Sequence, residues 1–234
     1  MKNYAIEDIT LSVKRLVGDG SVRGVEGFEL PDYALTVDEL VKRLCEASCE
    51  QVLLEAPISM LDKAADFSNS AVSYEPLSVY DPEKYAAVVT LPEDYLRLVS
   101  FKMESWKGRM PLQIAYGSSA YNRLRSRWNA GHGSVERPCI SIVPSASNTQ
   151  KLEAYSCATG EAVAQALYAP RPHLQGSSIS LFESLYLPSV YRIASNMLAT
   201  SGEASLSAYY EGESRKLMGY RTPAVTTPQN ETSE

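Results

Sequence analysis

The residue types that most often carry out acid–base chemistry are scarce in this chain. His132 lies in the turn GHG and His173 follows Pro172, and both positions are typical of ordinary loop histidines. The segment GDGSVRG at residues 18–24 misses the GxGxxG spacing of a phosphate-binding loop by one residue, and no predicted strand precedes it. We therefore interpret this segment as a hinge and predict no nucleotide cofactor.

Cysteine chemistry is limited as well. Cys45 and Cys49 are four residues apart and would share one face of a helix, but a structural zinc site needs two further ligands at close spacing. Cys139 and Cys157 form no CxxC pair, so we predict buried thiols and no metal site. Because the sequence offers no clear nucleophile, general base, metal site or cofactor loop, we predict that the protein is not an enzyme.

The composition indicates a folded globular chain. Of its 234 residues, 44% are hydrophobic and 21% are charged, and the net charge of -6 argues against a surface that coats nucleic acid. The chain has 15 tyrosines against 4 phenylalanines, a usage that suits interfaces with polar edges and that chance explains equally well. The opening residues MKNYAIEDIT lack the apolar core of a signal peptide, and no apolar run approaches the roughly 18 residues of a membrane span. We expect no membrane partner.

Helical patterns occur on both sides of a central β-rich stretch. Thr36 and Glu39 form a capping box, which predicts the start of a long amphipathic helix. Pro188 should kink or restart a later helix. Helices are predicted over residues 36–54, 58–66, 180–200 and 203–218. Since neither helical group can bury its apolar stripe alone, we expect the two groups to pack together.

The central stretch changes to the pattern of strands separated by turns. Strands are predicted over residues 85–91, 95–103, 110–116, 137–143, 151–157 and 162–168. The fold class is therefore α+β, with a helical bundle of N- and C-terminal helices and an inserted antiparallel β-sandwich or barrel-like unit. The predicted parts are an N-terminal arm (1–31), a helical domain (32–84 and 173–219), a β-rich domain (85–172) and a flexible C-terminal tail (220–234).

Charge is distributed unevenly along the chain. Residues 1–84 hold 8 basic and 16 acidic residues, whereas residues 97–127 hold seven basic residues against Glu104 alone. The candidate basic patch consists of Lys107, Arg109, Arg123, Arg125 and Arg127. This patch could face DNA phosphates, meet the acidic face of a neighbouring copy, or form an ordinary solvated surface.

The middle of the chain also carries a pattern known from one family. It reads LPEDYLRLVSFKMESWKGRMPLQIAYGSSAYNRLRSRW and then ERPCISIVP. This segment resembles the β unit of the head-to-tail adaptor and ring proteins of tailed phages, especially crAss-like phages of gut bacteria. The matching residues are Leu91, Pro92, Asp94, Tyr95, Trp106, Ser118, Ser119, Tyr121, Arg137 and Pro138.

The closing segment, LPSVYRIASNMLATSGEASLSAYYEGESRKLMGY, is similar to the paired C-terminal helices of the same family. The residues that fit are Tyr191, Gly202, Glu203, Ala204, Tyr209 and Tyr210. Together the quoted segments span 81 of the 234 residues, and their order carries the resemblance. The first thirty residues match no pattern of the family.

The resemblance implies a structural virion protein without a cofactor. Such proteins form a closed homo-oligomeric ring, typically of twelve copies, below the portal in the phage neck or tail. The ring would extend the channel for DNA ejection and would contact the portal protein, other neck and tail rings and the packaged DNA. The protein would be made in the bacterial host cytoplasm and end in the virion. Candidate contacts between subunits are Tyr191, Tyr209 and Tyr210.

Two other functions remain open from the residues alone. The β-rich domain could be a binding module for nucleic acid or glycan, in which case salt-sensitive DNA binding should be lost when Arg123, Arg125 and Arg127 are all replaced by alanine. An enzyme of unknown class would require an active site without an obvious histidine, cysteine pair or metal set.

Overall fold

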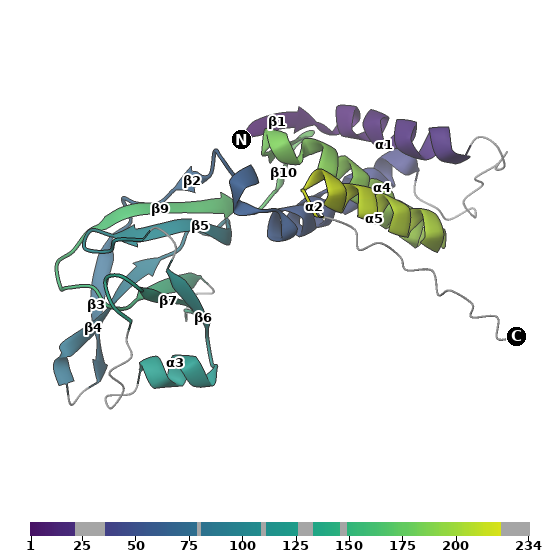
Figure 1. The fold of residues 1–234 in the computed structure, drawn as a ribbon. Coiled ribbons are helices and arrows are strands. Elements are labelled where there is room, and N and C mark those ends of the chain that lie inside the picture. Colours follow the sequence, from purple (N-terminus) through teal and green to yellow (C-terminus); the bar gives the residue numbers. More distant parts are fainter. Residues whose placement is uncertain (22–35, 79–80, 109–110, 126–132, 146–148, 221–234) are drawn as a thin grey trace, which may run out of the picture. The chain divides into compact units, whose positions relative to one another are not determined.

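The computed structural model describes residues 1–21, 36–78, 81–108, 111–125, 133–145 and 149–220 (Figure 1). Within these ranges it contains five α-helices and three β-sheets, so the fold is mixed α+β as predicted. The chain divides into two compact units. The terminal unit comprises Met1–Asp62 and Pro172–Glu234, and the central unit comprises Lys63–Arg171.

Four helices form most of the terminal unit. They are α1 (Ile6–Ser21), α2 (Val37–Glu55), α4 (Tyr186–Thr200) and α5 (Ala204–Leu217). Helix α4 packs against the other three, and their apolar side chains share one core that includes Ile9, Val41 and Ile193. Helices from both ends of the chain therefore contribute to one core.

The start of α2 confirms the predicted capping box. The backbone N–H of Glu39 donates to the Thr36 hydroxyl at 3.3 Å, and the Glu39 carboxylate accepts from the Thr36 backbone N–H at 2.9 Å. These bonds satisfy backbone donors that have no partner within the helix. The helix ends at Glu55, before Pro57, where a short 3-10 turn (Ile58–Met60) replaces the second predicted helix.

A small sheet also belongs to the terminal unit. Strands β1 (Lys2–Ala5) and β10 (Leu174–Gln175) both pair with β11 (Ser178–Leu181). The prediction of an arm over residues 1–31 is therefore wrong for residues 2–21, which form β1 and α1. The helix predicted from residue 180 begins instead at Tyr186, because residues 178–181 pair with a strand that is distant in sequence.

The central unit contains two sheets. The three-stranded sheet has the order β2 (Ala65–Asp66), β9 (Val163–Pro170) and β5 (Tyr95–Met103). The five-stranded sheet has the order β3 (Val72–Ser78), β4 (Asp81–Thr90), β8 (Gln150–Ala154), β7 (Cys139–Pro144) and β6 (Leu112–Ala115). A short helix, α3 (Ser119–Leu124), follows β6. Buried side chains from both sheets form one core, which includes Phe101, Ile140 and Trp106.

The five-stranded sheet is not wholly antiparallel, contrary to the prediction. Strand β6 pairs with β7 in parallel, from Leu112 beside Cys139 to Ala115 beside Ile142. Parallel neighbours need a long crossover connection instead of a tight hairpin. The connection here contains α3, and its length makes the parallel pairing feasible.

The β-rich part begins earlier than predicted. The sequence interpretation placed residues 63–84 in the helical domain, but these residues contribute β2, β3 and the start of β4 to the central unit. Strand β3 carries Pro76, which has no backbone N–H to donate. It is tolerated because β3 lies at the edge of the sheet and, among the described strands, pairs only with β4.

Two stacked tyrosines in the central core predict a dependence of stability on alkaline pH. Tyr95 and Tyr168 have ring centroids 6.0 Å apart, and burial is the main cause that raises the pKa of each to about 12. Unfolded tyrosine has a pKa of about 10, so between pH 10 and 12 the unfolded chain releases protons that the folded chain retains. Folding stability from these groups is complete below pH 10 and declines as pH rises towards 12.

The free energy of unfolding should therefore fall between pH 10 and pH 12, with Tyr95 alone contributing about 2 to 3 kcal/mol. Urea unfolding at several pH values in this range measures that slope. In Tyr95→Phe the slope should be shallower, because phenylalanine has no proton to lose. An identical slope in wild type and variant would contradict the assignment.

Candidate interaction surfaces

Strand β6 forms an exposed edge of the five-stranded sheet. Its only strand partner in the described part of the chain is β7. Leu112 at its start is 65% exposed, and Tyr116 just after its end is 56% exposed. Residues 112–116 include no charged residue and no proline, the residue types that commonly protect an edge from pairing with another chain. We call Leu112, Gln113, Ala115 and Tyr116 the edge surface.

The opposite edge of the same sheet is better protected. Strand β3 carries Pro76, and its pairing with β4 shifts register between Pro76 and Ser78. Proline and bulges are two of the features that discourage strand addition. The sheet therefore has one edge, β3, that disfavours pairing with another chain, and one edge, β6, that remains suited to such a contact.

Helix α3 is held close to the edge surface. The Ser118 hydroxyl caps it by accepting from the Tyr121 backbone N–H at 3.1 Å, and the Tyr121 ring lies edge-on to Tyr116 at 5.0 Å. The Ser141 hydroxyl donates to the Ile114 carbonyl oxygen at 2.9 Å, which ties β6 to β7 through a side chain. Specific contacts at Ile114 and Tyr116 thus support the edge surface.

A buried carboxylate anchors α3 to the sheet. Glu153 on β8 is 4% exposed, and its Oε1 lies 2.6 Å from Nη1 of Arg125. Its Oε2 accepts from the hydroxyls of Tyr155 at 2.5 Å and Tyr121 at 3.3 Å. Burial, followed by the nearby Glu153, raises the pKa of Tyr155, and burial is the main cause of the raised pKa of Tyr121. Both hydroxyls therefore keep their protons at neutral pH and act as donors.

This anchor changes the interpretation of the predicted basic patch. Arg125 is paired with Glu153 inside the central unit, and Lys107 forms a 2.7 Å surface ion pair with Glu136. Arg123 is exposed on α3, where its Nε donates to the Ser119 carbonyl oxygen at 3.3 Å. Arg109 and Arg127 lie outside the described residues. Two of the patch members therefore have acidic partners within the chain.

The three tyrosines predicted to contact other subunits differ in exposure. Tyr210 is only 8% exposed, and its hydroxyl donates to the Leu16 carbonyl oxygen at 2.7 Å, so it joins α5 to α1 within the chain. Tyr191 is partly buried against Tyr210, with ring centroids 5.9 Å apart. Tyr209 is 59% exposed and is the member of the set best placed for an external contact.

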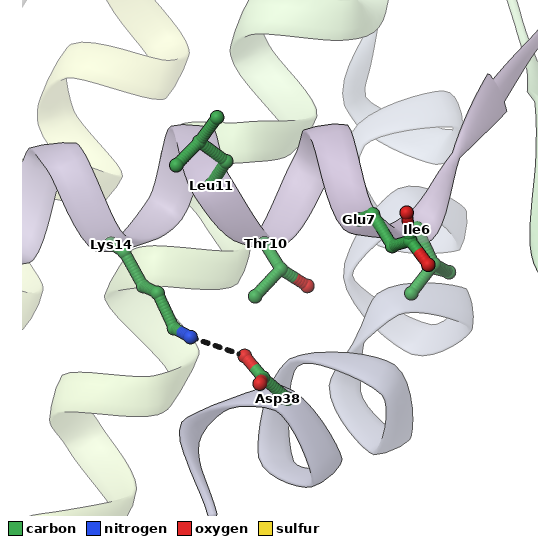
Figure 2. Close-up of a pocket in the computed structure, with 6 residues that line it drawn as sticks. All are labelled: Ile6, Glu7, Thr10, Leu11, Lys14 and Asp38. Carbon is green, nitrogen blue, oxygen red and sulfur yellow. Dashed lines mark ion pairs between the residues drawn. The ribbon is translucent and has the colours of Figure 1, made fainter.

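A groove in the terminal unit was not predicted from the sequence. It has a volume of about 530 Å³, and Figure 2 shows its walls on α1 and the first turn of α2. The residues that line it are Ile6, Glu7, Thr10, Leu11, Lys14 and Asp38. Lys14 Nζ and Asp38 Oδ1 form an ion pair of 2.6 Å at its rim. One residue in the sequence could have indicated this groove, because Leu11 is an apolar residue that lies outside the buried stripe of α1.

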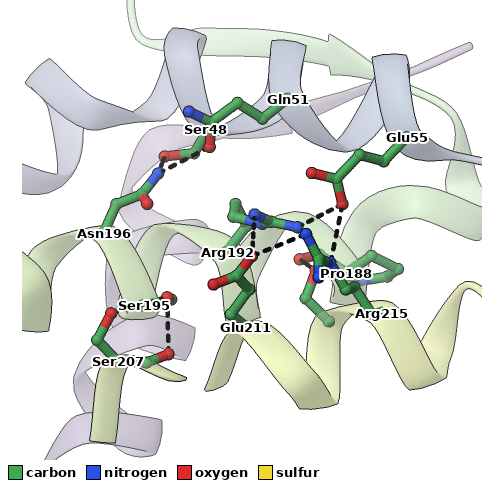
Figure 3. A network of polar contacts seen from close by, with 11 residues as sticks. Ser48, Gln51, Glu55, Pro188, Arg192, Ser195, Asn196, Ser207, Glu211 and Arg215 are labelled. Carbon is green, nitrogen blue, oxygen red and sulfur yellow. Dashed lines mark hydrogen bonds and ion pairs between the residues drawn. The ribbon is translucent and has the colours of Figure 1, made fainter. Parts of the chain in front are cut away.

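A network of charged side chains joins three helices of the terminal unit (Figure 3). Arg192 on α4 donates to Glu55 on α2 at 2.7 Å and to Glu211 on α5 at 3.3 Å. Arg215 contacts the same two carboxylates, at 3.4 Å and 3.0 Å. The network contains two arginines and two glutamates, so its charges balance. Because it lies between helices, we infer that it stabilises their packing.

Four cysteines and two histidines are the residues with the most potential for chemistry. Cys45, Cys49 and Cys139 are buried, and burial raises the pKa of Cys139 and Cys157, which is the opposite of what an activated thiol requires. His173 lies 3.0 Å from Glu46 and is exposed, while His132 falls outside the described ranges.

Within the described ranges, no three His, Cys, Asp or Glu residues are grouped so that they could hold a metal ion. No helix in that part of the chain has both the length and the apolar character needed to cross a bilayer. In comparisons with known proteins, no protein-family model and no curated protein sequence matches this chain.

Proposed function

We propose that this protein is a structural component of a tailed-phage virion that assembles into a ring in the neck or tail. In this role it lies below the portal, extends the channel through which DNA leaves the head, and contacts the portal protein and other ring proteins. The resemblance of residues 91–144 and 187–220 to adaptor and ring proteins motivates the proposal. The single structural observation that carries it is the edge surface on β6.

The edge surface suits an assembly protein because it exposes apolar area and the backbone groups of a sheet edge and because specific contacts hold it in a defined position. Leu112 and Tyr116 present apolar area to solvent, and the outer side of β6 offers backbone groups that can pair with another chain. The anchor between Arg125 and Glu153 holds α3 beside it. A preorganised surface binds with a smaller loss of conformational entropy, which favours repeated use in a symmetric assembly.

The two units also differ in net charge. The terminal unit has 10 basic and 18 acidic residues, whereas the central unit has 12 basic and 10 acidic residues. A cyclic ring is built from heterologous contacts, in which two different surfaces of each copy meet. Opposite charge on two parts of one chain favours such contacts over contacts between identical surfaces.

We also propose the finer architecture that the family resemblance implies. The four helices of the terminal unit would act as a bundle, and the two sheets of the central unit would act as a β-sandwich inserted into it. The shared core of both sheets, with Phe101 from one and Ile140 from the other, supports this description. The parallel pairing of β6 with β7 is a departure from a purely antiparallel sandwich.

The alternative function, a binding module for nucleic acid or glycan, has less structural support. It depends on the predicted basic patch, and Arg125 and Lys107 are already paired with carboxylates. DNA passing through a ring could still meet Arg123, so contact with packaged DNA belongs to the main proposal as a weak and sequence-independent interaction.

Electron microscopy of the purified protein tests the proposal directly. Class averages should show closed rings with one copy number, and mass spectrometry of purified phage particles should detect the protein. Absence from particles together with a monomeric purified protein would overturn it. Tight, salt-sensitive DNA binding by a monomer would favour the alternative function instead.

A further inference from the structure

Resting on the proposed ring, we propose that the groove on α1 and α2 of one copy receives the edge surface and Arg123 of the next copy. This assigns both halves of a head-to-tail contact. The central unit of each copy provides Tyr116 and Arg123, and the terminal unit of its neighbour provides the groove. The occupant of the groove is thus a second copy of this chain.

The groove has the chemistry to receive a tyrosine. Ile6 and Leu11 provide apolar contacts for an aromatic ring. The Thr10 hydroxyl, which also lines the groove, is buried and has no hydrogen-bond partner among the described residues. A buried hydroxyl without a partner is costly, and threonine has two accessible χ1 rotamers in a helix, so it can turn to meet an incoming hydroxyl.

The exposed tyrosine on the edge surface fits this description. Tyr116 directly follows β6 and is held edge-on against Tyr121, so its ring has a defined position. Tyrosine has a large apolar ring with a polar tip, which allows it to fill a partly wet groove at a low cost in conformational entropy. The groove volume of about 530 Å³ is large enough to admit a tyrosine side chain.

Charge complementarity favours a second copy as the occupant. The first turn of α1 carries Glu7 and Asp8, and neither forms an ion pair within the described part of the chain. Arg123 lies in the last turn of α3, near the end of β6. Placing Arg123 beside Glu7 would pair an exposed cation with an exposed carboxylate at the rim, where such pairs guide orientation and association rate.

Two variants that each block one surface test this contact. The groove variant carries Glu7→Lys and Leu11→Lys, and the edge variant carries Tyr116→Ser and Arg123→Ala. All four residues are exposed, so circular dichroism and thermal melting should match wild type. The matched control is Leu54→Lys, because Leu54 and Leu11 are both 49% exposed on helices.

Native mass spectrometry then measures the assemblies. Wild type and the control should form the ring, and each blocked variant alone should be monomeric. An equimolar mixture of the two variants should give heterodimers and nothing larger, because only one intact groove and one intact edge surface can meet. Rings from either blocked variant, or a mixture that stays monomeric, would overturn this contact while leaving the ring itself standing. A monomeric wild type would instead overturn the proposed function.

Discussion

Replacing Arg192 by alanine is expected to lower the free energy of unfolding by about 3 kcal/mol. Arg192 is 5% exposed, and its guanidinium lies between Glu55 and Glu211 from two other helices. Removing it leaves both carboxylates with Arg215, whose side chain is 52% exposed, as their cationic partner among the described residues. Loss of one member of a buried pair typically costs about 3 to 5 kcal/mol, and partial exposure of both carboxylates places this case at the lower end.

Urea unfolding of Arg192→Ala measures this effect, and Arg215→Ala is the matched control. Arg215 contacts the same carboxylates, but its side chain is 52% exposed. Exposed ion pairs contribute roughly 0 to 1 kcal/mol, so the control should lose far less stability. Equal losses of stability in the two variants would show that the burial of Arg192 does not determine its contribution to the free energy of unfolding.

Replacing Arg125 by alanine should be at least as destabilising for the central unit, at about 3 to 5 kcal/mol. The variant leaves the carboxylate of Glu153 buried, with only the hydroxyls of Tyr121 and Tyr155 as donors. Arg123→Ala on the same helix is the control, and it should change the free energy of unfolding by no more than about 0.5 kcal/mol.

The double variant Arg125→Ala with Glu153→Gln tests whether the loss of stability comes from the unpaired charge of Glu153 or from the lost packing of Arg125. A neutral amide removes the uncompensated charge, so stability should partly recover relative to Arg125→Ala alone. No recovery would show that the arginine acts through packing alone. The same result bears on any DNA-binding assay, because a triple alanine variant that includes Arg125 would lose binding through disruption of α3 whether or not the patch contacts DNA.

Local sequence signals predicted several elements well. The capping box of Thr36 and Glu39 located α2, and the strand predicted over residues 95–103 matches β5. In both cases the signal and the structure it produces lie within a few residues of each other. Pro188 shows how position modifies such a signal, because it lies in the first turn of α4, where proline is tolerated without a kink.

Signals that depend on distant partners were missed. Strand β1 pairs with residues about 175 positions later, so its neighbourhood gave no sign of a sheet. Strand β3 was not predicted, because its segment is rich in Ser, Tyr and Pro, a composition that we interpreted as a loop. Arg125 was assigned to a surface patch because its carboxylate partner is Glu153, 28 residues away on β8. The groove joins α1 to the start of α2, and only the folded chain brings these together.

The central claim is that copies of this chain associate head to tail through two different surfaces and close into a ring. Measuring the mass of the purified wild-type assembly over a range of concentrations tests it most directly. The prediction is one dominant species whose mass is a single integer multiple of 25.7 kDa, without a ladder of intermediate sizes. A species of 25.7 kDa at every concentration, or an open series of lengths, would contradict it.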